Sequence, residues 1–265
     1  MSVIYINPYN FGVALDADAA AYIARVEGAS GDNQALEQGV KDAINAFVIG
    51  CKADGIWTAI KASCILAGAR TLAGALQPLV GTAPTNNNFV TGDYNRETGL
   101  AGNGSSKYLD SNRTGNADPV DNHSAGVYVY TGGTPSNTTQ IYLGNFPGSG
   151  SGSTNIGFDS NQLFFRSRND NIDRFSASTD TGLVGLSRSS GSTYSVRANQ
   201  QDTSFTRGTQ TANTANIILY RDNSGAFPFY TNARFAFYFI GESLNLALLD
   251  SRVTALINAY TAAIP

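Results

Sequence analysis

The hydrophobic residues of the chain recur with a helical period before Pro78 and with a period of two after it. No proline falls between Pro8 and Pro78, which leaves a long window in which helices are allowed. Asp16 and Asp18 can cap a first helix that runs to about Val26. Its apolar face is formed by Ala19, Tyr22, Ile23 and Val26. The pattern therefore predicts that the front of the chain is helical.

Two more helices are predicted in this window, one capped by Asp32 or Asn33 and the other by Asp54. The apolar stripe of the second helix consists of Leu36, Val40, Ile44, Phe47, Val48 and Cys51. That of the third consists of Ile56, Trp57, Ile60, Cys64 and Ala67. The pattern leaves two uses open, a hairpin packed on its own domain or an interface between subunits around a symmetry axis. The candidate interface residues are Leu36, Val40, Ile44, Phe47, Trp57 and Ile60.

A segment rich in Gly, Pro and Asn at residues 81–88 is predicted to be a linker, and short strands follow it. The alternating runs lie at residues 126–131, 139–146, 154–158, 162–168, 182–188, 193–200, 216–221 and 233–240. Many short strands at regular spacing indicate an antiparallel sandwich or jelly roll. Ser243 can cap a last helix, whose apolar positions are Leu246, Leu249, Val253, Leu256, Ile257 and Tyr260.

The predicted fold class is therefore α+β. An N-terminal helical module for oligomerisation or docking covers residues 1–80, and a β-sandwich with a terminal helix covers residues 85–265. Hydrophobic residues make up 42% of the chain, which is enough to form a core.

Charge and hydropathy exclude several kinds of partner. Lys and Arg number 17 against 20 Asp and Glu, and a net charge of −3 offers no field that attracts a phosphate backbone. We therefore expect no nucleic-acid partner. The longest apolar run is shorter than 18 residues, so we expect no membrane insertion. The opening MSVIYINPYNFG lacks the charge and apolar pattern of a secretory signal.

Metal and histidine chemistry is limited because Cys51, Cys64 and His123 are the only residues of their types. A structural zinc site needs about four such ligands, so we expect no metal and no cofactor. Buried thiols are the ordinary interpretation of the two cysteines, and a disulfide between antiparallel helices is the alternative. His123 stands in the polar stretch DNHS and is predicted to be a solvated loop residue rather than a catalytic base.

Three segments resemble the concanavalin A-like superfamily, specifically its laminin-G and pentraxin-type jelly rolls. The first is GLAGNGSSKYLDSN (residues 99–112), which is similar to an early Gly-rich turn that leads into an aromatic strand. The second is GLSRSSGSTYSVRANQQ (residues 185–201), which is similar to a mid-chain hairpin. The third is ARFAFYFIGESLNLALLDSRVTALINAY (residues 233–260), which resembles the closing strand and its short helix.

A free-standing chain of this kind, with a helical front and an INPY-type opening, resembles virion proteins of tailed bacteriophages. This resemblance implies an exposed location on the virion, in the tail fibre, the baseplate or a capsid decoration. The partners it implies are further copies of the chain, as a homotrimer, and other virion proteins.

Glycan-cleaving enzymes also occur in the superfamily, and their chemistry needs two carboxylates across the scissile bond. The four glutamates are Glu27, Glu37, Glu97 and Glu242, and no predicted strand carries two of them on one face. The aspartate pairs 118/121 and 170/173 lie in polar stretches typical of surface turns. We therefore expect that the protein is not an enzyme and has no catalytic residues.

Sugar binding fits the loops better, because Asn, Asp and Arg beside aromatic rings can hold a saccharide. Satisfied turns are the alternative interpretation of the same residues. The candidate ligand contacts are Asn95, Arg96, Asn112, Arg113, Arg221, Asn223 and Tyr230. The predicted function is a lectin-like component of a phage tail, baseplate or fibre that attaches to a host-surface glycan. The alternatives are a capsid decoration protein, and then a carbohydrate-binding module or a glycan-cleaving enzyme.

Overall fold

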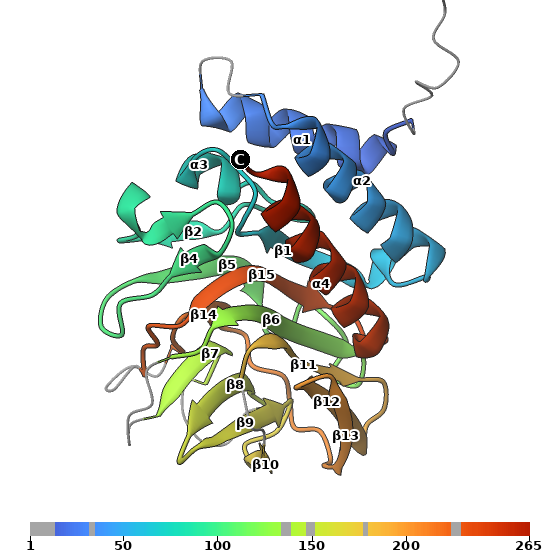
Figure 1. Ribbon diagram of the computed structural model, residues 1–265. Helices are drawn as coiled ribbons and strands as arrows, with labels where there is room; N and C mark the ends of the chain where they lie inside the picture. The colour runs from blue at the N-terminus through green and yellow to red at the C-terminus, as the bar shows by residue number, and fades with distance from the viewer. Residues whose placement is uncertain (1–13, 32–34, 134–138, 147–151, 177–179, 224–228) are drawn as a thin grey trace, which may run out of the picture.

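A computed structural model describes residues 14–31, 35–133, 139–146, 152–176, 180–223 and 229–265. Within these residues the chain forms two antiparallel sheets that face each other, with helices covering one outer side (Figure 1). The observed class is the predicted one: N-terminal helices, a β-sandwich and a C-terminal helix.

Sheet A carries the helical layer, and sheet B forms the other half of the sandwich. The strands of sheet A, in spatial order, are β13 (Gln201–Thr206), β12 (Thr193–Ala198), β11 (Gly182–Arg188), β6 (His123–Thr131), β15 (Arg234–Gly241), β4 (Gly99–Ala101) and β3 (Tyr94–Asn95), and β1 (Ile60–Ile65) also pairs with β15. Those of sheet B are β10 (Asp173–Phe175), β9 (Gln162–Ser167), β8 (Thr154–Asp159), β7 (Gln140–Gly144), β14 (Asn216–Leu219), β5 (Tyr108–Thr114) and β2 (Thr85–Asn87).

The eight alternating runs predicted as strands are confirmed as β6, β7, β8, β9, β11, β12, β14 and β15. Apart from β1 (Ile60–Ile65), the strands that alternation missed are short or polar. An example is β2, which lies inside the predicted linker and pairs with β5. A three-residue edge strand is too short for a period of two to show in the sequence.

The helices are α1 (Ala17–Ser30), α2 (Gln38–Ala53), the short α3 (Leu72–Ala75) and α4 (Leu246–Ala263), with 3₁₀ turns at Trp57–Ala59 and Thr91–Asp93. Asp16 caps α1 as predicted, and its side chain accepts a hydrogen bond from the Asp18 amide. The other predicted caps are wrong where they can be compared. Glu37 stands at the N-cap of α2, and Asn245 instead of Ser243 caps α4. Asp32 and Asn33 lie outside the described residues.

The predicted third helix is wrong, because residues 57–65 form a 3₁₀ turn and then strand β1. Ile60 and Ile65 pack among the helices, while Ala62 and Cys64 face the interior of the sandwich. A strand that is buried on both faces reads as a continuous apolar run, and periodicity cannot distinguish such a run from a buried helix.

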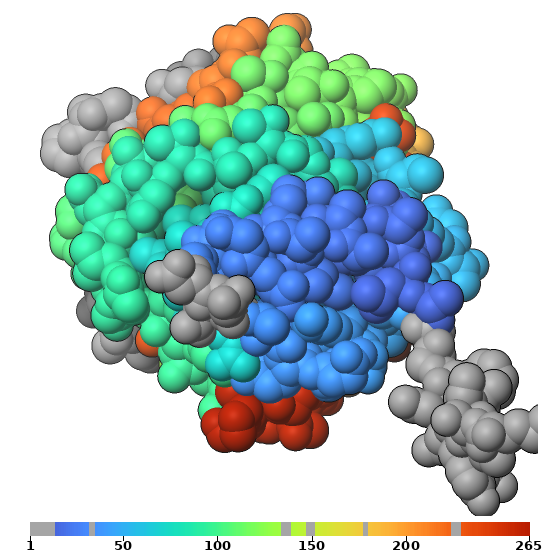
Figure 2. All heavy atoms as spheres, turned by 90° about the horizontal axis from the view of Figure 1, so that it is seen from above, coloured from blue at the N-terminus to red at the C-terminus, as the bar shows by residue number. Residues whose placement is uncertain are grey.

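The helical core lies between α1, α2, α4 and the outer face of sheet A (Figure 1). Figure 2 shows α1 and α2, in two shades of blue, side by side over this face. Phe47 of α2 meets Phe237 of β15 edge to face, with the ring centroids 5.8 Å apart. The apolar positions predicted for α4 are all buried here: Leu246, Leu249, Val253, Leu256, Ile257 and Tyr260.

This packing corrects the suggestion that the stripe is a subunit interface. Leu36, Val40, Ile44, Phe47 and Ile60 are each at most 5% exposed within a single chain. Side chains that are already enclosed by their own sheet and helices present no surface to a second copy. Trp57 is half-buried against the same core, with Lys52 above its ring.

Cys51 and Cys64 are both buried and unbonded, which confirms the interpretation as buried thiols. Burial raises the pKa of each thiol to about 12. A thiol held in its neutral form in an apolar site is unreactive and acts as a packing group.

Candidate functional site

Two of the predicted sugar contacts, Asn95 and Arg96, have structural roles. The Asn95 side-chain oxygen accepts hydrogen bonds from the amides of residues 97 and 98 and closes a turn. The Arg96 guanidinium forms a forked contact with Glu37, with N–O distances of 3.1 and 2.6 Å. Arg96 also donates to the Ala69 carbonyl, so it ties the helical layer to sheet A instead of facing a ligand.

Asn112 and Arg113 are also occupied by the fold. Asn112 has a φ of 55° and donates to the Ala83 carbonyl at 2.8 Å, which fastens β5 to the segment before β2. Arg113 forms an ion pair with Asp118, a carboxylate that is only 5% exposed. The prediction of Asp118 in a surface turn is therefore wrong. In the second pair, Asp173 is 7% exposed, lies in β10 and is bound by Arg207, so the prediction is wrong for this residue as well.

Arg221 and Tyr230 are in contact in the structure. A third residue, Tyr108 at the start of β5, also contacts Arg221 and was not predicted from the sequence. Arg221 Nη1 donates to the Tyr230 hydroxyl at 2.9 Å. Its guanidinium carbon lies 4.8 Å from the Tyr108 ring centroid and 5.2 Å from that of Tyr230. Asn223 does not join this aromatic–arginine cluster; its amide donates to the Asn216 carbonyl instead. Phe229, which directly precedes Tyr230 in the sequence, is 42% exposed.

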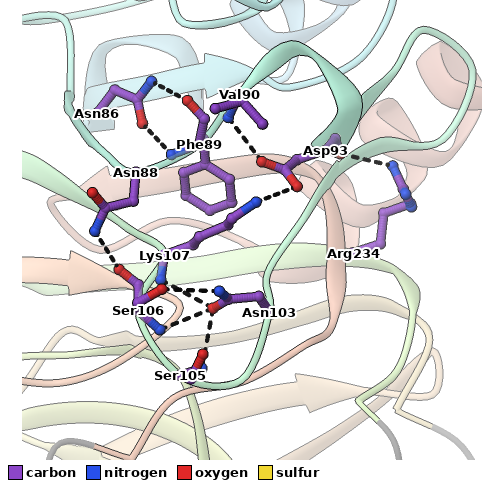
Figure 3. A network of polar contacts seen from close by, with 10 residues as sticks. All are labelled: Asn86, Asn88, Phe89, Val90, Asp93, Asn103, Ser105, Ser106, Lys107 and Arg234. Atoms are coloured by element: carbon purple, nitrogen blue, oxygen red, sulfur yellow. Dashed lines mark hydrogen bonds and ion pairs between the residues drawn. The ribbon is translucent and has the colours of Figure 1, made fainter.

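A network of polar contacts fixes the loop that leads into Tyr108 (Figure 3). The Asn103 side-chain oxygen accepts hydrogen bonds from the backbone amides of residues 105, 106 and 107. Lys107 forms an ion pair with Asp93, whose other carboxylate oxygen accepts from the Val90 amide at 2.8 Å. These contacts hold the loop without using Tyr108, which leaves the ring of that residue for Arg221.

A groove runs between α4 and sheet A and consists of two adjoining hollows of about 370 Å³ each. Both hollows are lined by Gln200, Asp250 and Thr254. We call this feature the α4 groove. Its volume falls in the range of about 300–1,000 Å³ that is typical of small-molecule sites. Figure 1 shows α4 lying over β6 and reaching β11, the strands beneath the groove.

Aromatic and polar groups share the lining of the α4 groove. Tyr128 and Tyr130 of β6 contribute rings, and Tyr130 is 37% exposed. Asp250 is 4% exposed and accepts from Arg197 Nε at 2.7 Å and from the Thr254 hydroxyl at 3.2 Å. Burial raises the pKa of the Tyr128 hydroxyl, which stays protonated and able to donate. The groove therefore offers one exposed ring, hydroxyl groups and a fixed carboxylate.

The sequence alone favours a core or cross-strand role for Tyr128 and Tyr130, because they are aromatic residues of a predicted strand, and it indicates no role for Asp250. The alternation in β6 does put both tyrosines on one face of the strand. The packing of residues about 120 positions apart in the chain decides which face of β6 is covered by α4. It also decides that Asp250 lines the same groove as these two rings. No local signal could have shown it.

His123 is another correction, because it is fully buried at the start of β6 instead of solvated. Its Nε2 lies 3.1 Å from the Thr154 hydroxyl. Burial and the nearby positive charge of Arg168 lower the pKa of His123 to about 4, so the ring is neutral at neutral pH. A buried, neutral histidine between two sheets is placed to connect them.

The described residues contain no group of three or more His, Cys, Asp and Glu side chains suited to hold a metal ion. None of the helices in the part of the chain that the structure describes has the length and apolar character needed to cross a membrane.

No protein-family model and no curated protein matches the sequence. Among solved structures, the chain is similar to a sialidase of Trypanosoma rangeli in complex with sialic acid, with a TM-score of 0.50 and 13% identity over 76% of this chain and 33% of the sialidase. It is also similar to the CBM40 of the Ruminococcus gnavus IT-sialidase bound to α2,3-sialyllactose, with a TM-score of 0.38 and 12% identity over 49% of this chain and 80% of that one. The chain thus spans about a third of the T. rangeli enzyme that it resembles.

The likeness to the sialidase shows the fold alone, a sandwich of two antiparallel sheets. It also corrects the expectation that the protein is not an enzyme, because this fold occurs in part of a sialidase, which is an enzyme. The absence of paired glutamates on a strand was too narrow a criterion. The virion location and the homotrimer are not tested by these similarities and stay predictions.

Proposed function

We propose that the protein is a lectin-like glycan-binding protein and that the α4 groove is its sugar site. The observation that carries this proposal is the exposed face of Tyr130 beside the fixed carboxylate of Asp250 in a hollow of about 370 Å³. An aromatic face next to directional hydrogen-bonding groups is the combination that a saccharide, with its apolar ring face and its hydroxyl groups, can fill.

The charge of the groove favours a neutral glycan. Arg197 is bound by two carboxylates, Asp250 at 2.7 Å and Asp202 at 2.9 Å, so this side of the groove carries one excess negative charge. Carboxylate oxygens accept hydrogen bonds from sugar hydroxyls, whereas an acidic sugar would be repelled. The likeness to a sialidase in complex with sialic acid supports a glycan as the general ligand class, while the negative charge of the α4 groove favours a neutral sugar over an acidic one of that kind.

The resemblance to tailed-phage virion proteins supports a location on the exposed surface of a particle, in the tail, the baseplate or a fibre. There the groove would contact a host-surface glycan. The proposed homotrimer requires a contact surface other than the stripe of α2, because that stripe is enclosed in the helical core. Light scattering of the purified chain and antibody labelling of phage particles test these two points.

The sugar site is tested by a glycan array followed by titration of the best neutral glycan. Tyr130→Ala should weaken binding about tenfold, since contacts to an aromatic face are worth roughly 0.5–1.5 kcal/mol and 1.4 kcal/mol is a factor of ten. Tyr230→Ala, in the aromatic–arginine cluster, is the matched control and should bind as the unaltered protein does. Loss of binding in Tyr230→Ala alone would move the site to that cluster, and no binding to any glycan would refute the proposal.

A further inference from the structure

One end of the sandwich interior is polar. In sheet A the register pairs His123 of β6 with Arg188 of β11, and in sheet B it pairs Thr154 with Ser167. These four residues, which we call the polar end layer, meet between the sheets. His123 Nε2 lies 3.1 Å from the Thr154 hydroxyl, and Arg188 Nε donates to the Ser167 hydroxyl at 3.2 Å. Two positions further in, the facing residues are apolar: Ala125, Ile156, Phe165 and Leu186.

Arg168 directly follows this layer in the chain and is fully buried. None of its three guanidinium nitrogens, Nε, Nη1 and Nη2, has a hydrogen-bond partner among the described residues. Arg188, the other fully buried arginine, is different. It donates to the carbonyls of residues 167, 190, 193 and 207. Arg168 is therefore a buried cation whose five donor hydrogens have no acceptor within the described part of the chain.

The surrounding charges leave Arg168 uncompensated. The carboxylate of Asp118 interacts electrostatically with Arg168, but this carboxylate is already paired with Arg113. Arg113 and Arg188 add further positive charge. His123 is neutral, and its Nδ1 has no hydrogen-bond partner, lying 3.7 Å from the nearer Asp118 oxygen. A guanidinium excluded from water without a counter-charge is strongly unfavourable, so the site calls for an anion.

We propose that the polar end of the sandwich is a binding site for a small anion, held by the Arg168 guanidinium. A halide, a phosphate or a carboxylate can accept from this planar fork of donors, whereas a neutral or cationic molecule cannot compensate its charge. This site is separate from the α4 groove, which lies on the opposite, helix-covered face of sheet A. The anion is taken up as the sheets close over Arg168, so its binding is linked to folding.

Thermal unfolding measures this linkage. The full chain is titrated with sodium chloride, sodium phosphate or sodium acetate, while a bulky sulfonate salt holds the ionic strength constant. At least one probe should raise Tm in a saturable manner, by about 5–10 °C at a hundred times its Kd. The salt that raises Tm identifies the class of the bound anion as a halide, an oxoanion or a carboxylate. If none of the three gives a saturable rise, the proposal is overturned.

Variants separate the site from general salt effects. Arg168→Met should lose the saturable rise, while Arg174→Met, at a partly exposed arginine of β10 that pairs with Asp159, should keep it. Arg168→Lys keeps the charge and should shift the midpoint of the titration to higher anion concentration. This variant provides the test if Arg168→Met fails to fold. An unchanged rise in both Arg168 variants would contradict the assignment. If chloride is the probe that raises Tm, a crystal grown with sodium bromide whose anomalous signal lies away from Arg168 would contradict it as well.

Discussion

Sheet A separates two cores that differ in the polarity of their buried residues. On its outer face, the helical core joins α1, α2 and α4 through aliphatic and aromatic contacts such as that of Phe47 with Phe237. On its inner face, the sandwich core is apolar in the middle but ends in the polar layer of His123 and Arg188. Apolar packing is non-directional, so its contribution to stability falls roughly in proportion to the buried apolar surface that a mutation removes. A buried polar group is different, because it destabilises the fold if it lacks a hydrogen-bond partner.

The largest effect is expected in the helical core. Phe47→Ala should lower the free energy of unfolding by about 3–5 kcal/mol, because it removes a ring that is 2% exposed and leaves a cavity. Chemical denaturation followed by far-ultraviolet circular dichroism measures this loss. Ile49→Ala, on the same helix but 39% exposed, is the control and should change stability by less than about 0.5 kcal/mol. A Phe47→Ala variant of normal stability that only dissociates from other copies would restore the interface interpretation of the stripe.

The polar end should show itself as a dependence of stability on pH. The pKa of His123 is lowered to about 4 in the folded chain, mainly by burial and by Arg168. The unfolded chain, with a histidine pKa near 6.5, therefore binds more protons between these two values. Stability is complete above about pH 6.5 and falls as the pH drops towards 4, by about 3 kcal/mol in total.

Denaturation midpoints at pH 7, 6 and 5 measure this effect, and His123→Gln, which cannot titrate, should flatten the profile. The carboxylates interfere little in this window. Burial raises the pKa of Asp118, but its contacts with His123 and Arg113 outweigh burial and lower the value to about 2, so Asp118 titrates only in stronger acid. Equal pH profiles for the two proteins would show that His123 is not the titrating group.

The smallest effect is expected where the two interiors are fastened together at the surface. The forked contact of Arg96 with Glu37 joins the helical layer to sheet A, and both side chains are about a fifth exposed. A double-mutant cycle with Arg96→Leu and Glu37→Gln should give a coupling of about 1 kcal/mol. The more exposed pair of Lys61 with Glu242 should give a coupling near zero. A larger coupling for Lys61 and Glu242 than for Arg96 and Glu37 would reverse this ranking.

Local sequence predicted those elements whose spacing or residue types are distinctive. The three- and four-residue steps of α4 mark its buried face, and β6 and β15 were recognised, although both of their faces are largely buried, because aromatic and β-branched residues run through them. The prediction failed at β1, where both faces are buried and the period is lost. Arg221 and Tyr230, two of the predicted sugar contacts, also lie against Tyr108, which local sequence could not indicate because Tyr108 comes from a distant strand.

The amino-acid sequence by itself determined the class of the protein: helices in front, an antiparallel sandwich behind, and unreactive thiols. These follow from periodicity and composition, which are local properties. Only the tertiary structure decided that the α2 stripe is enclosed, that Asp250 meets Tyr130 across a groove, and that His123 and Arg168 are buried. The physical reason is that burial and charge pairing are set by which distant segments pack together, and local periodicity carries no information about that choice.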